Sequence, residues 1–340
     1  LASNVAFAIE RAELSDNIVE MFESFVAASV DAIEARDPTT AGHSQRVTKY
    51  TLEFARVVNE LDREELSEFE FDREEMRELR YAALLHDFGK IAVEEAVLQK
   101  GNRLEESRLE QLEQRYETIA SKAFERFVRE GLEERGDLSA EAMAEIDERH
   151  EDFCSELGER LDKIRELARA PSLTDEQIEW VEECGAESFV DTEENEYAYL
   201  TPFEVESLSI QYGTLNDEEW EQVKSHPAHS RRFLDRIPWS EELELIPSIA
   251  AAHHEKLDGS GYPEGLGEEE LLPQVRMLTI ADIFDALTAS DRPYRDAFSV
   301  QKAKSILEDE ADSGKLDPRL VEVFSQKVLP RIESMVPNDE

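Results

Sequence analysis

Apolar residues recur at spacings of three and four through most of the chain, and polar residues fill the positions between them. This spacing is typical of helices that bury one face, whereas the alternating runs that predict strands are scarce. Residues 1–35 form one long pattern, whose apolar positions are Val5, Ile9, Ile18, Phe22, Phe25, Val30 and Ile33. The pattern predicts an all-α chain that begins with a long helix.

The role of this first helix has two interpretations. A long helix at the start of a domain is often a connector or the seam of a dimer. Alternatively, the helix packs only on its own domain. Both interpretations stay open at this point, and the first predicts a homodimer through residues 1–35.

The composition changes in the middle of the chain. Between positions 101 and 210 there are 32 acidic and 12 basic residues. Helix starts are marked there and just beyond by capping-box pairs and by a proline at a first helical position. These are Thr174 with Gln177, Thr201 with Glu204 beside Pro202, and Asn216 with Glu219. We expect an acidic helical insertion, whose charge forms a solvated face or, alternatively, a surface for a protein partner.

The net charge of the 340 residues is -44. Basic patches supply the affinity for nucleic-acid polymers and anionic lipids, so binding to either is not expected. The sequence shows no apolar run of membrane-spanning length and no signal-peptide pattern, which predicts a cytoplasmic protein. Cys154 and Cys184 lack the spacing of a metal site or a disulfide framework and are expected to be reduced thiols.

Seven polar residues stand out as candidate metal ligands because each lies among apolar neighbours. They are His43, His86, Asp87, His226, His253, His254 and Asp282. Adjacent histidines such as His253 and His254 point about 100° apart on a helix, so packing on one apolar face does not explain the pair. Imidazoles and carboxylates in a low-dielectric interior need partners, and a divalent metal supplies one.

The types of these residues narrow the chemistry. Imidazole and carboxylate without thiolate suit iron, manganese, zinc or nickel. Five histidines and two aspartates are too many for one ion, so we expect two divalent ions. A carboxylate such as Asp87 is able to bridge a pair of ions, and such a pair activates water for in-line attack on phosphorus.

Five motifs occur in a fixed order: GHSQRV, HDFGK, HP, HHEKLDGSGYP and ADIFDALTASDRPYR. Together they resemble the HD-GYP domain, a branch of the HD phosphohydrolases that degrades the messenger cyclic di-GMP. The resemblance covers residues 21–101 and 213–340, and it implies an HD-type helical bundle interrupted by the insertion at 102–212. The segment LASNVAFAIERAEL resembles the last helix of GAF sensory domains, so residues 1–20 are interpreted as a linker or signalling helix.

The resemblance also implies a division of the ligands. One metal would be held by His43, His86, Asp87 and Asp282, and the other by Asp87, His226, His253 and His254. Of the four metals that suit these ligands, we expect iron or manganese. Members with three metals carry a glutamate where this chain has Thr39, so a two-metal site is expected.

Several residues are candidates for contact with the substrate. Lys90 resembles the family lysine beside the scissile phosphate, or is an exposed lysine that stabilises a helix end. Arg292 and Arg295 resemble phosphate-binding residues, or are ordinary surface arginines. Tyr262 and Tyr294 pack on guanine or fill the core, and Arg46 holds a phosphate or pairs with an acidic neighbour.

The expected function is a metal-dependent phosphodiesterase that hydrolyses cyclic di-GMP to pGpG, with Asp87 and Lys90 as catalytic residues; whether a second cut to GMP follows stays open. Two alternatives remain. The chain is a cyclic di-GMP sensor with slow turnover, or it hydrolyses another nucleotide such as a hybrid cyclic dinucleotide.

Overall fold

The computed structural model describes residues 2–37, 41–61, 66, 69–136, 138–289 and 297–332. Over these residues the chain is all-α apart from two strands of three residues each. It divides into two compact units, which are residues 1–99 with 221–340 (the first unit) and residues 100–220 (the second unit). The functional assignment of the predicted domain ranges stays a prediction.

The first unit holds all of the predicted ligands. Its helical elements are α1 (Ala2–Glu34), α2 (His43–Glu60), α3 (Arg73–Leu85), η3 (Phe88–Ala92), α4 (Glu95–Leu98), α10 (His226–Leu234), η4 (Glu241–Leu243), α11 (Ile246–Ala251), α12 (Pro273–Thr288), α13 (Val300–Asp312), α14 (Pro318–Val323), η5 (Phe324–Val328) and α15 (Leu329–Ile332). Helix α9 (Asp217–Lys224) runs across the boundary between the units.

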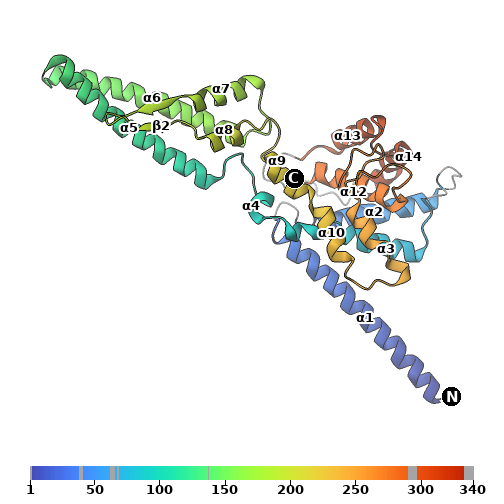
Figure 1. Cartoon of the computed structure of the whole chain (residues 1–340). Coiled ribbons are helices and arrows are strands. Elements are labelled where there is room, and N and C mark those ends of the chain that lie inside the picture. Colours follow the sequence, from blue (N-terminus) through green and yellow to red (C-terminus); the bar gives the residue numbers. More distant parts are fainter. Residues whose placement is uncertain are drawn as a thin grey trace. The chain divides into compact units, whose positions relative to one another are not determined.

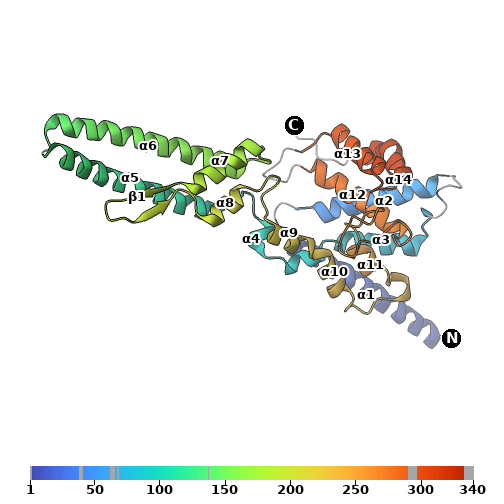
Figure 2. The same cartoon turned by 45° about the horizontal axis from the view of Figure 1, so that its top comes forward.

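Helix α12 lies at the centre of the first unit. Its sequence is apolar on nearly every face, which is the pattern of a helix surrounded by protein. Figures 1 and 2 show α12 beside α2, and the two helices are in contact. Phe284 of α12 packs edge-on against Tyr50 and Phe324. This close-packed core fixes the helix ends that carry the polar residues described below.

Helix α1 is long, as predicted, but it has two apolar faces where one was expected. Val26, Val30 and Ile33 are buried in the first unit. Ile18 and Phe25 are 53% and 60% exposed, so they do not share the buried face with Val30 and Ile33. The reason is the helical period, because Phe25 lies about 100° round the helix from its buried neighbour Val26. Val5 and Ile9 lie outside the residues whose side chains are described.

The second unit is a helical hairpin with smaller elements packed on it. The elements are α5 (Glu106–Arg135), α6 (Ala140–Arg169), α7 (Asp175–Ala186), β1 (Ser188–Val190), β2 (Glu196–Ala198) and α8 (Pro202–Leu208). Figures 1 and 2 show α5 and α6 side by side. Arg103 is 1% exposed, and its guanidinium donates to the carbonyl oxygens of Ile210, Leu167 and Ala170 at the base of the unit.

The predicted caps are confirmed. Thr174 and Thr201 both form complete capping boxes, and Pro202 is the first residue of α8. The backbone N–H of Asn216 donates to Oε2 of Glu219, and the backbone N–H of Glu219 donates to Oδ1 of Asn216, both at 2.9 Å. The antiparallel pair β1–β2 was missed, because strands of three residues are too short to show alternation. Among the described residues, no helix combines the length and apolar composition that crossing a bilayer requires.

Candidate metal centre

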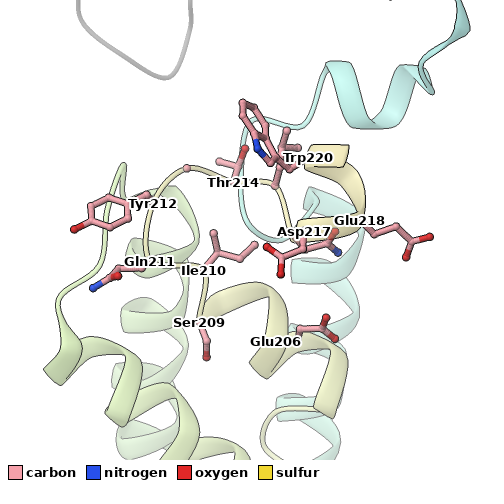
Figure 3. Close-up of a pocket in the computed structure, with 12 residues that line it drawn as sticks. Glu206, Ser209, Ile210, Gln211, Tyr212, Thr214, Asp217, Glu218 and Trp220 are labelled. Atoms are coloured by element: carbon pink, nitrogen blue, oxygen red, sulfur yellow. The ribbon is translucent and has the colours of Figure 1, made fainter. Parts of the chain in front are cut away.

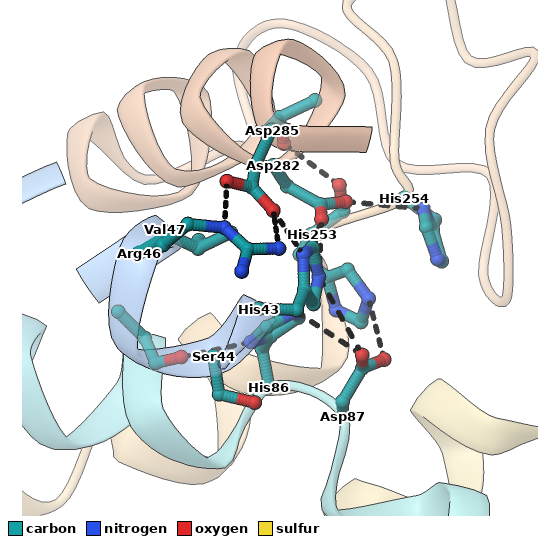
Figure 4. A network of polar contacts seen from close by, with 12 residues as sticks. His43, Ser44, Arg46, Val47, His86, Asp87, His253, His254, Asp282 and Asp285 are labelled. Atoms are coloured by element: carbon teal, nitrogen blue, oxygen red, sulfur yellow. Dashed lines mark hydrogen bonds and ion pairs between the residues drawn. The ribbon is translucent and has the colours of Figure 1, made fainter. Parts of the chain in front are cut away.

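The structure brings the seven predicted ligands together from five segments. His43 begins α2, His86 and Asp87 follow α3, His226 begins α10, His253 and His254 follow α11, and Asp282 lies on α12. Their ligand atoms form overlapping groups within 4.8 Å, namely His226, His253 and His254; His43, His86 and Asp282; and His86, Asp87 and His253. Figure 4 labels six of the seven, all but His226, and shows their side chains converging between α2 and α12.

Helix ends orient three of the histidines. The last turn of a helix leaves carbonyl oxygens without partners. The Nδ1 atoms use these oxygens: His86 with Ala83 at 2.8 Å, His226 with Val223 at 2.7 Å, and His253 with Ala250 at 2.7 Å. Because a carbonyl only accepts, each Nδ1 carries the proton and each Nε2 offers its lone pair to the centre.

Asp87 stands between two groups of histidines. Its Oδ2 lies 3.7 Å from Nε2 of His43 and 3.5 Å from Nε2 of His86. Its Oδ1 lies 3.2 Å from Nε2 of His226 and 4.0 Å from Nε2 of His253. The two oxygens of one carboxylate therefore face different sets of ligands, which is the arrangement of a bridging carboxylate.

A divalent metal fits this donor set. Nε2 of His86 is buried and has no hydrogen-bond partner among the described residues. It lies 3.5 Å from Oδ2 of Asp87 and 3.8 Å from Oδ1 of Asp282. A buried polar atom without a partner is rare in a protein, and a cation between the imidazole and the carboxylates would satisfy it.

The histidines differ in their electrostatic surroundings. Burial by itself lowers the pKa of His43, but the carboxylates of Asp282, Asp285 and Asp87 outweigh it and raise the pKa to about 9. Burial lowers the pKa of His254 to about 3. His43 therefore lies in the most negative part of the centre, and His254 offers a neutral ring.

The carboxylates stay ionised. Burial raises the pKa of Asp87, but the positive charge of Lys90 and the neighbouring imidazoles hold it well below its usual range. His43 and His86 lower the pKa of Asp282 in the same way against the effect of burial. Two buried carboxylates that stay negatively charged among imidazole nitrogens are the donor set of a cation site.

Lys90 lies inside the centre. Its Nζ is 2.9 Å from Oδ2 of Asp87 and 3.3 Å from Oδ2 of Asp37, and its side chain is 14% exposed. These contacts do not fit the alternative of an exposed lysine at a helix end. Its pKa is raised, because Asp87 and Asp37 outweigh the effect of burial.

The other predicted contact residues have different positions. The ring of Tyr262 lies 4.8 Å from that of His254, centroid to centroid. Arg46 is paired with Asp285, so the alternative of an acidic neighbour is realised; its contact with a phosphate stays a prediction. Arg292 and Arg295, as well as Tyr294 and Thr39, lie outside the described residues.

Two acidic residues at the centre were missed from the sequence. Asp285 is 1% exposed and contacts both His43 and Arg46. Its position three residues after Asp282, on an otherwise apolar helix, was an available signal. Glu255 is 2% exposed and directly follows the histidine pair. A buried carboxylate next to two candidate ligands was the corresponding signal there.

Glu255 holds the loop that contains Gly261, Tyr262 and Pro263. Its Oε1 accepts from the backbone N–H groups of Glu264 at 2.7 Å and Gly265 at 3.2 Å, and its Oε2 accepts from Leu266 at 3.0 Å. Gly261 allows the close approach, because a Cβ there would lie 2.4 Å from Cα of Glu255. One side chain thus ties the loop to the histidine pair.

We expect Glu255→Ala to lower the free energy of unfolding by about 2 kcal/mol, because charged hydrogen bonds to backbone N–H groups are lost together. Urea unfolding measures this loss. Glu255→Gln is the matched control, since the amide oxygen still accepts, and it should lose less. Equal stability of the alanine and glutamine variants would contradict the role of the carboxylate.

Two other polar features of the second unit do not form comparable sites. A cavity of about 820 Å³ is lined by residues 206 and 209–218 and by Trp220, and it contains none of the predicted site residues (Figure 3). Sγ of Cys154 lies 3.4 Å from Nε2 of His150, which also lies 2.9 Å from the carbonyl oxygen of Ala120. Both cysteines are free thiols, as predicted.

Known proteins share parts of this sequence. The HD domain model matches residues 40–178, and a second model, also described as HD domain, matches residues 198–320. A 3′3′-cGAMP-specific phosphodiesterase from Vibrio cholerae is 41% identical over 106 residues, which are 31% of this chain and 22% of the relative. A cyclic di-GMP phosphodiesterase from Thermotoga maritima is 41% identical over 118 residues, 34% of this chain and 31% of the relative.

A cyclic di-GMP phosphodiesterase from Pseudomonas aeruginosa is 34% identical over 116 residues, which are 34% of this chain and 27% of the relative. The matches to these three curated relatives span 22% to 31% of each relative's length. With its helical fold, its histidine and aspartate centre and both family matches, the chain belongs to the HD phosphohydrolase family.

Proposed function

We propose that the chain is a metal-dependent phosphodiesterase of the HD-GYP type that hydrolyses cyclic di-GMP. The observation that carries the proposal is the position of Asp87, whose two oxygens face different groups of histidines. The orphaned Nε2 of His86 supports metal binding. The names of relatives support the substrate class.

The seven ligands would hold two divalent ions, with Asp87 shared between the two sets. When bound, such ions supply Lewis acidity, which lowers the pKa of water and offsets phosphate charge. Water adds to one phosphorus, and the bond to the ribose 3′ oxygen breaks, which yields linear pGpG; a second cut would yield GMP. Lys90 brings a positive charge to the centre, where it offsets charge that develops on the phosphodiester.

The second candidate substrate is 3′3′-cGAMP. The observation that favours it is the name of the Vibrio cholerae relative, which is specific for that hybrid cyclic dinucleotide. A third reading is a sensor that retains the metals but turns over slowly. Its binding signal would pass to a partner through α1 or through the second unit.

The test is anaerobic incubation of the whole chain, loaded with iron or manganese, with cyclic di-GMP and separately with 3′3′-cGAMP. Chromatography of the products decides between the candidates. We expect pGpG or GMP from cyclic di-GMP with either metal. Turnover of 3′3′-cGAMP alone supports the second candidate, binding without turnover supports the sensor, and activity only on other nucleotides rejects all three.

The proposed metal content is two ions per chain, iron or manganese. Elemental analysis after anaerobic purification measures it. Three ions per chain would contradict the two-metal proposal, whose sequence basis, Thr39, lies outside the part that the structure describes.

We also propose a homodimer through α1. Leu14, Ile18, Met21 and Phe25 are each at least half exposed. Their separations of four, three and four residues match the 3.5-residue repeat of a coiled-coil seam. This seam lies beside the buried face of Val26, so one helix is able to pack on its own unit and on a second copy.

The distribution of charge along α1 favours a second copy of this acidic chain as the partner that covers the exposed seam. The four acidic residues at positions 12–24 all fall outside the seam and outside its flanking positions 15, 17, 22 and 24. Those flanking positions carry serine, asparagine, phenylalanine and serine. Two such helices would therefore meet without placing carboxylates against each other, even though the chain has a net charge of -44.

Replacement of Ile18 and Phe25 by glutamate should convert the dimer into a monomer, because it places charges in the seam. Size-exclusion chromatography with light scattering measures the mass. Val19→Glu is the control: Val19 is 45% exposed but lies off the seam, so this variant should stay dimeric. A monomeric parent chain, or a dimer that survives both seam substitutions, would remove the proposal.

Three further predictions from the sequence stay proposals. They are a protein partner for the acidic second unit, a cytoplasmic location, and an upstream GAF-like domain joined to residues 1–20.

A further inference from the structure

We propose that Asp285 and Arg46 form a positioning pair that fixes His43 as a metal ligand. Nδ1 of His43 lies 2.7 Å from Oδ2 of Asp285. A carboxylate accepts hydrogen bonds, so Nδ1 carries the proton and Nε2 points to the centre, 3.1 Å from Oδ1 of Asp282. The inference rests on the proposed metal site and adds residues that act on a ligand.

His43 needs a side-chain acceptor because of its place in the fold. His86, His226 and His253 each follow a helix end, where free carbonyl oxygens accept from Nδ1. His43 is the first residue of α2, after the N-cap Gly42. A helix N-terminus offers free N–H groups rather than carbonyl oxygens, and α1 ends at Glu34, well before His43, whereas α9 ends just before His226. Asp285 supplies the missing acceptor from α12.

Arg46 fixes the carboxylate of Asp285. Its Nε donates to Oδ1 at 2.8 Å and its Nη2 donates to Oδ2 at 3.1 Å, which is a two-point contact. Its Nη1 also donates to the carbonyl oxygen of Ala41 at 3.0 Å, just before α2. The guanidinium therefore holds the buried carboxylate in one orientation and offsets its charge (Figure 4).

The geometry has a chemical consequence at the centre. Asp282 and Asp285 lie one turn apart on α12, so the same helix presents one carboxylate to each nitrogen of the His43 ring. A carboxylate that accepts from the far nitrogen of a ligating histidine fixes its tautomer and increases its basicity. Arg46 would thus affect metal binding indirectly, because it orients Asp285, which orients His43.

Metal affinity measures this role directly. For Asp285→Asn we expect Mn²⁺ affinity to fall tenfold to a hundredfold, roughly the range for loss of such a partner. Titration calorimetry of the metal-free whole chain, with elemental analysis after dialysis, gives affinity and stoichiometry. Arg46→Lys keeps a positive charge but loses the two-point contact, so we expect it to show a smaller loss in affinity than Asp285→Asn. This variant tests the pair even where Asp285→Asn does not fold.

Asp317→Asn is the matched control. Asp317 is 2% exposed and pairs with Arg276 and Arg319 in the same unit, and none of these three residues is a predicted ligand. It should lower the melting temperature and leave Mn²⁺ affinity within about twofold of the parent. Because a merely structural role for Asp285 would do the same, affinity separates the two roles.

The outcomes distinguish this inference from the proposed function. A parent chain that binds no divalent metal overturns the metal site itself. A parent that binds metal, with unchanged affinity in folded Asp285→Asn or in Arg46→Lys, overturns only the positioning pair. Weaker binding in both variants, with parental affinity in Asp317→Asn, supports it.

Discussion

Asp87→Ala is expected to remove both metals and to lower hydrolysis of the cyclic dinucleotide by more than about a hundredfold. Losing a residue that hydrogen-bonds to a metal ligand already lowers activity by up to about a hundredfold. Asp87 is itself a proposed ligand, and its two oxygens face both sets of histidines. Removing it takes one donor from each set at once. Elemental analysis should fall from two ions to none, together with product formation.

The control for Asp87→Ala is Asp37→Asn. Lys90 contacts both carboxylates, at 2.9 Å for Asp87 and 3.3 Å for Asp37, but Asp37 is not one of the seven predicted ligands. Asp37→Asn should therefore keep both metals. An Asp87→Ala chain that retains two ions would show that the carboxylate does not bridge, whatever its effect on turnover.

The sequence was informative where a local signal exists. The capping boxes at Thr174 and Thr201 require only two residues three positions apart, and both formed as expected. The convergence of His43, His86 and Asp282 could be anticipated because polar residues in apolar segments need buried partners. The family resemblance then supplied the division of ligands that the residues alone left open.

Other features depend on tertiary geometry that no local pattern carries. The partner of Arg46 is Asp285, 239 residues away, so sequence spacing could not choose it over a phosphate. Phe25 fits the helical pattern of α1 as well as Val26 does, and only packing decides which of the two is buried. The pattern of residues 1–35 allowed a dimer seam, but only the burial of Val26 and the exposure of Phe25 indicate which face would form it.

Gly89→Ala is expected to destabilise the first unit by about 3 kcal/mol, the upper range for overpacking a well-packed site. A Cβ at position 89 would lie 1.9 Å from the carbonyl oxygen of His226 and 2.4 Å from the backbone nitrogen of Ser230. Both are backbone atoms of α10, so the helix itself must move. Urea unfolding of the metal-free chain measures the loss.

The same substitution should act selectively on the metals. Gly89 also donates its N–H to Oγ of Ser230 at 2.7 Å, and Ser230 donates to the carbonyl oxygen of His86 at 2.8 Å. These contacts fasten the start of α10, and with it His226, beside Asp87. Displacing α10 should weaken the ion assigned to His226, and elemental analysis should approach one ion per chain.

Gly267→Ala provides the comparison for Gly89→Ala within the same unit. The nearest atom to a Cβ at position 267 would be the carbonyl oxygen of Leu257, at 3.8 Å, which is an ordinary contact. This variant should stay within about 0.5 kcal/mol of the parent, as surface substitutions usually do, and should keep two ions. If Gly89→Ala matched it in both measurements, η3 and α10 would not be packed closely enough to set the distance between Asp87 and His226. The bridging role of Asp87 would then need another support.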